Sequence, residues 1–204
     1  GEWYGIDISE VMLKQAFDKN ANIKWTLGDV VSLPYSDEYF NGAVCSLAIH
    51  HFTDLTSAFK EVYRVIDKGN FIIFTAFPDQ MQSYWLCNYF PEMMRRSIHN
   101  MPDQKTLVTS LQSVGFEVKN IAPFFVTNEL QDMFLYSGKE RPEIYFDPNV
   151  RSNISSFASI CNNVELDNGL SSLRADLSTG KFLSIKQKYP SLSGDYAYVV
   201  ARKN

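Results

Sequence analysis

Short apolar runs alternate with segments of helical periodicity through the first 77 residues of the chain. The apolar runs span residues 2–8, 23–27, 42–47 and 71–75. Their lengths and their content of β-branched and aromatic residues are typical of β-strands. Because the run 42–47 is apolar or small throughout, we expect a strand that is buried on both faces. Strands that alternate with helices predict right-handed crossovers, and therefore an α/β fold with a mostly parallel sheet and flanking helices.

Two helices in this region are predicted from an N-cap residue followed by an apolar stripe. Ser9 comes before the first stripe and Asp54 before the second, and both side chains can accept hydrogen bonds from the free amides of a first helical turn. The residues of the two stripes are Val11, Met12, Leu13 and Ala16, and then Ala58, Val62, Val65 and Ile66. We expect residues 67–70 to end the second helix before the next strand begins.

The pattern changes after residue 77. Residues 79–101 are rich in Tyr, Trp, Phe and Met and contain no clean strand. A helix is predicted over residues 103–114, with Gly115 at its C-terminal cap, and a strand is predicted over residues 118–126.

Residues 127–195 give a weaker pattern. Regularly spaced leucines predict one amphipathic helix that ends at Gly180. These leucines are Leu166, Leu170, Leu173 and Leu177. A closing strand is predicted over residues 196–201, so we interpret 127–195 as a helical insertion before the last strand, with a role that the sequence does not assign.

Length and composition favour one soluble domain. The 204 residues predict a single domain over 1–204, and a hydrophobic content of 45% is enough for a buried core. A net charge of −4 argues against a nucleic-acid partner, because phosphate contacts need a basic surface. No apolar stretch approaches the roughly 20 residues that cross a bilayer, and a signal peptide is not expected because no basic stretch followed by an apolar one stands near the start. We therefore expect a soluble, cytoplasmic protein without membrane association.

The cysteines and histidines do not form a metal motif. Cys45, Cys87 and Cys161 are far apart, and no zinc-ligand spacing exists among them. The chain has only 3 histidines to add to them. A metal site is therefore not expected, and we interpret the cysteines as buried or free thiols of a reducing compartment.

Polar residues follow three of the predicted strands directly. The segments are Asp7-Ile8, Gly28-Asp29-Val30 and Ser46-Leu47-Ala48. In open α/β sheets ligands bind at the carboxyl ends of the strands, so the site is expected here. A strand-end carboxylate such as Asp7 can accept hydrogen bonds from both hydroxyls of a ribose, although dinucleotide sites use the same device. An Asp after a strand is also often only a helix or turn cap.

Four segments, in order, resemble motifs of class I S-adenosylmethionine-dependent methyltransferases. Residues 4–13 resemble the second-strand motif and 28–35 the segment after the third strand, while 40–54 resemble the fourth strand with its exit and 61–69 the helix and turn before the fifth. The likeness covers residues 1–120 approximately and is nearest to small-molecule enzymes, including those of quinone biosynthesis. The resemblance implies a Rossmann-like fold, S-adenosylmethionine as cofactor, and methyl transfer to an oxygen, nitrogen or carbon nucleophile of a small molecule.

The resemblance also implies roles for the residues at the strand ends. Asp7 would bind the ribose, and Asp29 would accept from the exocyclic amine of adenine while the Val30 amide donates to a ring nitrogen. The other candidates are apolar contacts to adenine and residues at the methionine end, which are Ile8 and Met12, and Ser46 and Leu47. Ile8 and Met12 are equally open to interpretation as core residues, because apolar residues near strand ends are more often buried.

Two histidines and an aromatic segment are candidates on the substrate side. The resemblance places His50 and His51 at the floor of a substrate pocket, and we favour His51 as the catalytic base because adjacent residues do not easily face one pocket. Alternatively, one histidine caps the next helix and the other packs. Residues 79–101 lie where the family inserts a lid, and the alternatives are a helix packed against the domain or a homodimer contact. The lid residues expected to bind substrate are Tyr84, Trp85 and Tyr89.

The first strand and the glycine-rich loop of the family have no counterpart in the sequence. No Gly-x-Gly cluster occurs among the 10 glycines. In the resembled fold the first strand lies centrally, between the second and the fourth, so its absence would leave two strand edges without a partner. We therefore expect the chain to be a fragment of a longer one, with poor cofactor affinity if it is not.

Two other interpretations stay open. A truncated or degenerate methyltransferase-like domain could serve as a non-enzymatic binding or assembly module, which the missing glycine loop favours and the Asp7 and Asp29 segments oppose. A nucleotide-dependent oxidoreductase would share the acidic residue at the end of the first strand, but it explains neither residues 28–30 nor residues 46–54.

Overall fold

The computed structural model describes residues 1–204 as two compact units, which are described separately below. Unit 1 comprises Gly1–Ile73, Lys105–Asn120 and Val199–Asn204. Unit 2 comprises Phe74–Gln104 and Ile121–Tyr198. Whether the two units together make the single domain that the length suggests stays a prediction.

Unit 1 begins with a small parallel sheet. Strand β1 (Tyr4–Asp7) pairs with strand β2 (Lys24–Leu27), so that Asp7 lies opposite Leu27. Helix α1 (Glu10–Lys19) joins them, and the Ser9 hydroxyl accepts a hydrogen bond from the Met12 amide at 3.3 Å. The predicted strands, helix and N-cap are confirmed, because the sequence supplies a polar cap between an apolar strand and a helical stripe.

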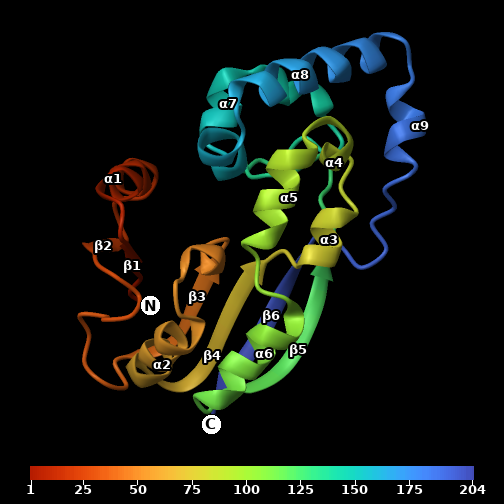
Figure 1. Ribbon diagram of the computed structural model, residues 1–204. Helices are drawn as coiled ribbons and strands as arrows, with labels where there is room; N and C mark the ends of the chain where they lie inside the picture. Colours follow the sequence, from red (N-terminus) through yellow and green to blue (C-terminus); the bar gives the residue numbers. More distant parts are fainter. The chain divides into compact units, whose positions relative to one another are not determined.

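A second sheet contains four strands in the order β3-β4-β6-β5. The strands are β3 (Phe40–Ser46), β4 (Ile66–Thr75), β6 (Tyr196–Lys203) and β5 (Glu117–Phe124). Figure 1 shows that β6 runs opposite to β4 and β5, so the sheet is mixed. Together with its flanking helices it gives the Rossmann-like α/β fold that the sequence predicts.

The β-structure is divided where the sequence predicts a missing strand. Strand β1 has only β2 as a neighbour, and β3 has only β4, so each has one edge without a strand partner. At their amino ends the strands are linked by side chains instead, because the rings of Tyr4 and Phe40 meet edge to face at 5.3 Å between centroids.

The prediction that 42–47 is a strand buried on both faces is wrong. No residue of β3 is buried, and the Val44 side chain is 63% exposed. The apolar composition identified a strand correctly, but burial depends on neighbours. Because β3 has a neighbour on one side only, it is an edge strand.

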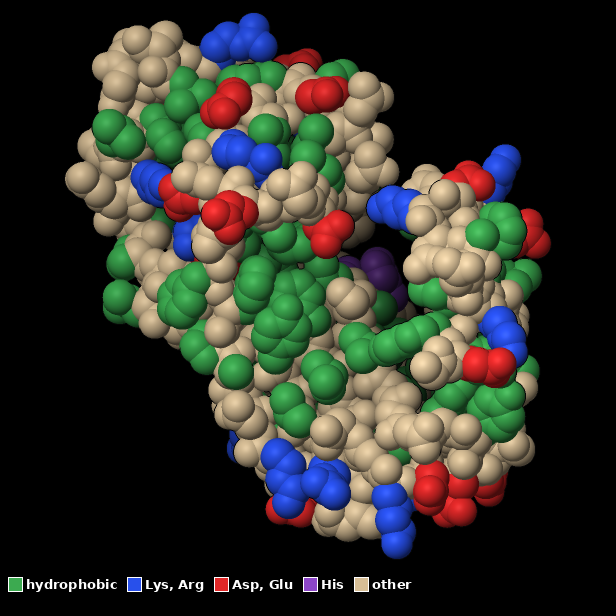
Figure 2. Space-filling view, turned by 180° about the vertical axis from the view of Figure 1, so that it is seen from behind, with side chains coloured by type: hydrophobic (Ala, Val, Ile, Leu, Met, Phe, Trp, Pro, Cys, Tyr) green, Lys and Arg blue, Asp and Glu red, His purple; other side chains and the backbone are tan.

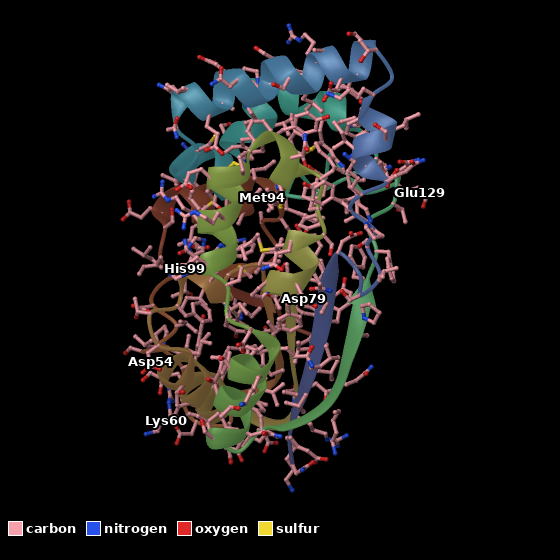
Figure 3. The ribbon with its side chains drawn as sticks, turned by 45° about the vertical axis from the view of Figure 1, so that its right-hand side comes forward. Asp54, Lys60, Asp79, Met94, His99 and Glu129 are labelled. Atoms are coloured by element: carbon pink, nitrogen blue, oxygen red, sulfur yellow. The ribbon has the colours of Figure 1, made fainter.

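Helix α2 (Leu55–Val65) contributes four buried residues to the core of unit 1. The Asp54 carboxylate at its start (Figure 3) accepts hydrogen bonds from the Thr56 and Ser57 amides at 2.9 and 3.2 Å. The expected inward stripe is buried, but the expected helix end at 67–70 is wrong, because α2 ends at Val65 and β4 begins at Ile66. The polar residues 67–70, which the sequence predicts as the end of the helix, are therefore part of β4.

The last helix of unit 1 is α6 (Gln104–Ser113), whose buried residues are Leu107 and Leu111. Gly115 follows with φ +105°, a backbone conformation that favours glycine. A side chain here would also meet the ring of Tyr63, since a Cβ would lie 3.0 Å from its nearest atom.

Unit 2 is largely helical. Its α-helices are α3 (Pro78–Gln82), α4 (Leu86–Tyr89), α5 (Pro91–His99), α7 (Pro148–Ser152), α8 (Asn163–Ser178) and α9 (Phe182–Lys186). Two further helical turns are the 3-10 turn η2 (Pro142–Phe146) and the π turn η3 (Ser156–Ile160). The leucine pattern correctly predicts α8, and Gly180 beyond it has φ +74°. None of the helices in the structure is both long and apolar enough to cross a bilayer.

Aromatic side chains form the core of unit 2. The rings of Tyr84 and Tyr136 stack at 4.0 Å, and the Tyr84 and Tyr145 hydroxyls share a hydrogen bond of 2.6 Å. Buried Asp195, 1% exposed, accepts hydrogen bonds from the Lys139 ammonium and from the Val126 amide. The Tyr84 and Tyr145 hydroxyls and the Asp195 carboxylate therefore all have hydrogen-bond partners, as buried polar groups in a stable core require.

Candidate functional site

The two predicted carboxylates lie at the carboxyl ends of neighbouring parallel strands. Asp7 is the last residue of β1, and Asp29 follows β2 by two positions. The Gly28 amide donates a hydrogen bond to the Asp7 carbonyl at 3.0 Å, which fixes the start of the segment after β2 against the end of β1. The structure therefore brings the Asp7 and Asp29 segments together.

Each carboxylate has a local turn role and a free oxygen. Asp7 Oδ1 accepts from the Ser9 amide at 2.8 Å, and Asp29 Oδ1 accepts from the Val31 amide at 3.1 Å. These are Asx-type contacts that shape the chain after a strand. The Oδ2 atom of each residue has no hydrogen bond within the chain, so both can still accept from a ligand.

The neighbouring candidates are open to solvent. Ile8 is 72% exposed and Met12 is 50% exposed, so their interpretation as core residues is wrong. The Val30 amide donates no hydrogen bond within the chain. Exposed apolar groups beside an unused amide and two free carboxylate oxygens can offer a ligand both apolar contact and hydrogen bonds.

The chain leaves β3 through a strained turn. Leu47 has φ +51°, which is uncommon for a residue with a side chain, and the turn η1 (Ile49–His51) follows. Ser46 is exposed and Leu47 is half-buried. Backbone strain of this kind costs about 1–3 kcal/mol and is often found at functional sites.

The two histidines of this turn have different surroundings. The rings of His50 and His51 are 4.0 Å apart between centroids. His50 Nδ1 is buried without a hydrogen-bond partner, and desolvation, aided by neighbouring His51, lowers the pKa of His50 to about 4. His51 is exposed. At neutral pH His50 is therefore an uncharged imidazole with an unused ring nitrogen.

The three aromatic residues expected in a lid lie in unit 2, in its core. Tyr84, Trp85 and Tyr89 are buried. The indole of Trp85 donates to the Lys139 carbonyl at 3.1 Å, and the Tyr89 hydroxyl donates to Asp176 at 3.1 Å. This packing fits the alternative of helices packed within the protein, and contact of these residues with substrate stays a prediction.

Sequence reasoning missed one pair of residues near the candidate site. Arg64 and Glu61, on the last turns of α2, hold the segment between β2 and β3 through hydrogen bonds to its backbone. Glu61 and Arg64 lie in the motif 61–69, and their i,i+3 spacing on a helix is the one signal that the sequence offers.

Metal and thiol chemistry have little support in the structure. No group of three or more His, Cys, Asp or Glu side chains is close enough to hold a metal ion. All three cysteines are free, and burial raises the pKa of Cys45 to about 11. Cys45 is therefore a protonated thiol at neutral pH, without the thiolate that nucleophilic chemistry needs.

Comparisons with known proteins agree with the fold. Residues 1–74 match a family described as "Methyltransferase domain". The chain is 28% identical over 141 residues to the ubiquinone/menaquinone biosynthesis C-methyltransferase UbiE of Caulobacter sp. (strain K31). The matched region covers 58% of this chain and 56% of that protein. It is 29% identical over 164 residues to the demethylmenaquinone methyltransferase of Staphylococcus carnosus (strain TM300), and this match covers 69% of this chain and 67% of that protein.

A solved structure resembles nearly the whole chain. It is described as a methyltransferase from an antibiotic biosynthesis pathway of Anabaena variabilis ATCC 29413, with a TM-score of 0.85 and 28% identity over 98% of this chain and 81% of that one.

Acidic residues at the carboxyl ends of adjacent parallel strands in a Rossmann-like α/β fold are also found in many nucleotide-binding proteins. The motif order and the matches above show that the chain is similar to class I S-adenosylmethionine-dependent methyltransferases in sequence and in fold. It spans about half the length of the first curated relatives it matches.

Proposed function

We propose that this chain binds S-adenosylmethionine through unit 1 and takes part in methyl transfer to a small-molecule nucleophile. The observation that carries the proposal is the pair Asp7 and Asp29, each with a free carboxylate oxygen, at the ends of adjacent parallel strands. The matches to methyltransferases of quinone metabolism and to the Anabaena structure support the same activity.

The residues of unit 1 fit the adenosine end of the cofactor. Asp7 Oδ2 would accept from the ribose hydroxyls, and Asp29 Oδ2 would accept from the adenine amine. The unused Val30 amide would donate to a ring nitrogen. Apolar contact with the base would come from Ile8 and Met12, whose exposed side chains would lose water on binding.

The fit at the methionine end rests on fewer groups. We propose Ser46 and Leu47 for this end, because they follow β3 directly. The sequence has no Gly-x-Gly turn whose amides could cradle a carboxylate, so these 204 residues hold the amino-acid end less fully than the adenosine end.

When bound, S-adenosylmethionine supplies a methyl group on a sulfonium, which is already a reactive electrophile. The chain would contribute alignment and exclusion of water, which are the main requirements of such a displacement. Exposed His51 is our candidate to take a proton from a hydroxyl or amine acceptor. Neutral His50, with its unused Nδ1, is our candidate to bind the acceptor.

The proposal also covers the methyl acceptor and the cellular compartment. The relatives named above are methyltransferases of ubiquinone or menaquinone biosynthesis and of demethylmenaquinone, and we extend to this chain only a small-molecule acceptor with an oxygen, nitrogen or carbon nucleophile. Tyr84, Trp85 and Tyr89 stay candidates for acceptor contact, and the segment 79–101 stays a candidate homodimer contact. We place the activity in the cytoplasm, where the free cysteines would stay reduced.

Calorimetric titration with S-adenosylmethionine and its demethylated product, S-adenosylhomocysteine, tests the proposal. We expect micromolar binding that Asp7→Ala and Asp29→Ala each weaken at least about tenfold, because each removes a charge-assisted hydrogen bond. Asp18→Ala is the matched control, since Asp18 is an exposed carboxylate on α1.

Two outcomes would contradict this proposal. If the folded chain binds neither compound, the non-enzymatic binding or assembly module becomes the better interpretation. If it binds both but the two substitutions have no more effect than Asp18→Ala, the cofactor lies elsewhere.

A further inference from the structure

The segment that carries Asp29 has ring contacts only toward its far end, at Tyr35 and Tyr39. Residues 28–39 connect β2 to β3, and none of their side chains is buried. A surface segment of this kind keeps one conformation only when its backbone polar groups have fixed partners. The position of Asp29 and Val30 therefore depends on hydrogen bonds from the rest of unit 1.

Three of these hydrogen bonds come from one guanidinium. Arg64 Nη1 donates to the Tyr35 carbonyl at 2.7 Å and to Asp37 Oδ1 at 2.8 Å. Its Nη2 donates to the Leu33 carbonyl at 3.0 Å and to Glu61 Oε2 at 2.8 Å, and its Nε donates to Glu61 Oε1 at 2.9 Å. All five donors of the group are used.

Glu61 fixes the guanidinium and also contacts the segment directly. Its two oxygens accept from Arg64 in a bidentate pair, and Glu61 Oε2 accepts from the Leu33 amide at 3.0 Å. The hydrogen bond from Arg64 is the main reason that the pKa of Glu61 is lowered, so the carboxylate is charged at neutral pH. Because Leu33 both donates to Glu61 and accepts from Arg64, its backbone is held from two sides.

The backbone of α2 completes the attachment. The Arg64 carbonyl accepts from the Glu38 amide at 2.9 Å, and Glu38 has φ +58°, a strained value for a residue with a side chain. At the other end, the Gly28 amide is bound to the Asp7 carbonyl. The segment is thus fixed at residue 28 and at residues 33–38, with Asp29 and Val30 between these points.

We propose that Arg64, oriented by Glu61, is a positioning residue that sets the Asp29 carboxylate and the Val30 amide for the adenine of the cofactor. The inference rests on the proposed function, because it assigns the adenine to that segment. A lysine cannot replace the arginine here, since a single ammonium does not reach two carbonyls and two carboxylates in a planar fork.

The test combines two measurements on the full chain. Hydrogen–deuterium exchange followed by mass spectrometry reports whether residues 29–38 are held, and calorimetry reports the affinity for S-adenosylhomocysteine. The variants are Arg64→Lys and the milder Glu61→Gln. Arg95→Lys is the matched control, because Arg95 forms an exposed i,i+3 pair with Glu92 on α5 of unit 2.

We expect Arg64→Lys to speed exchange over residues 29–38 and to weaken binding about tenfold, with Glu61→Gln intermediate and Arg95→Lys unchanged. In a chain that already carries Asp29→Ala, Arg64→Lys should cause little further loss of affinity. If Arg64 acts through Asp29, the two substitutions together weaken binding by clearly less than the product of their separate effects.

Each result decides the inference. Faster exchange with unchanged affinity, or fully additive losses in the Arg64→Lys/Asp29→Ala double variant, overturns it and leaves Arg64 with a structural role only. If Arg64→Lys does not fold, Glu61→Gln alone decides by the same two criteria. If the unsubstituted chain does not bind S-adenosylhomocysteine, the proposed function is refuted, and this inference with it. If the unsubstituted chain binds and Arg64→Lys binds equally well, only the inference is refuted.

Discussion

At the scale of single residues, adjacent side chains in this protein have unlike environments. His50 is half-buried with an unpaired Nδ1, whereas its neighbour His51 is exposed. The turn after β3 points one imidazole toward the protein and leaves the other in water. This difference has a consequence for stability that does not depend on any ligand.

We predict that His50 makes the fold less stable in mild acid. Its pKa is about 4 in the folded chain and 6.5 ordinarily, so between these values the unfolded chain binds more protons at this site. Stability therefore falls as pH drops from 6.5 to 4, by about 1–2 kcal/mol once residual solvent contact is allowed for. Urea unfolding at pH 7.5 and at pH 5 measures the loss.

The neighbouring histidine provides the control for this prediction. His50→Gln should reduce the difference between the two pH values, and His51→Gln should leave it unchanged. An equal response of both variants would show that burial of His50 is not the cause.

The strand-end residues could be predicted from the sequence, whereas Arg64 could not. Asp7 and Asp29 follow apolar strands directly, so their place at the carboxyl ends is a consequence of strand position alone. The role of Arg64 depends on carbonyl groups at residues 33 and 35, and every residue type has a carbonyl. The amino-acid sequence of residues 33–35 therefore does not reveal that an arginine side chain binds their carbonyl groups.

At the scale of elements, α8 was predictable as a helix, but its packing was not. Gly169 lies in its middle and is buried. A Cβ at this position would lie 2.3 Å from the ring of Phe90 and 2.6 Å from the Tyr89 carbonyl oxygen. The glycine is therefore required by the close approach of α4 to α8, although glycine is a poor helix former.

We predict that Gly169→Ala destabilises unit 2 despite the better helix propensity of alanine. The clash involves backbone, which cannot rotate away, so a loss of about 1–3 kcal/mol is expected. Ser172→Ala, on the exposed face of the same helix, should be neutral or slightly stabilising. Thermal unfolding of the two variants decides, and a gain in stability for both would contradict the observed packing of α8.

The start of β6 is tied to the segment after β5 by a buried ion pair. Asp195 receives hydrogen bonds from Lys139, from the Val126 amide and from the Ser191 hydroxyl. Lys139 is itself mostly buried. Removal of one partner leaves a buried charge uncompensated, which is far more costly than the net contribution of the intact pair.

We therefore predict that Asp195→Ala destabilises the protein by about 3–5 kcal/mol in denaturant unfolding. Asp132→Ala is the control, because Asp132 is exposed in the same connection. The double variant Asp195→Ala/Lys139→Met should recover part of the loss, since it removes the stranded charge as well. A loss below 1 kcal/mol for Asp195→Ala would mean that solvent replaces the carboxylate.

At the scale of the whole molecule, burial is unevenly distributed along the chain. No residue before Ile49 is buried, whereas β4, α2 and the helices of unit 2 supply most of the core. Exposed apolar side chains accompany this pattern, and in the first 48 residues they include Trp3, Ile8, Val11 and Phe17. Figure 2 shows hydrophobic side chains among mixed charges on one face of the surface. The sequence predicted strands and helices here, since local pattern decides their type. Burial was misjudged at β3 because it depends on segments distant in the sequence.

This uneven burial predicts a matching gradient of local stability. Amides of β1 and β2 are bonded in a two-stranded ladder with little buried surface, so they should exchange through local opening. Those of β4, within the four-stranded sheet, should exchange only on global unfolding. We expect the free energy of opening to be at least about 2 kcal/mol lower for β1 and β2 than for β4. If S-adenosylhomocysteine binds as proposed, a saturating concentration should slow exchange at β1 and β2 first, because binding adds its free energy to the closed form. Equal protection of β1 and β4 in the free chain would mean that residues 1–48 are held by interactions that their exposure does not reveal.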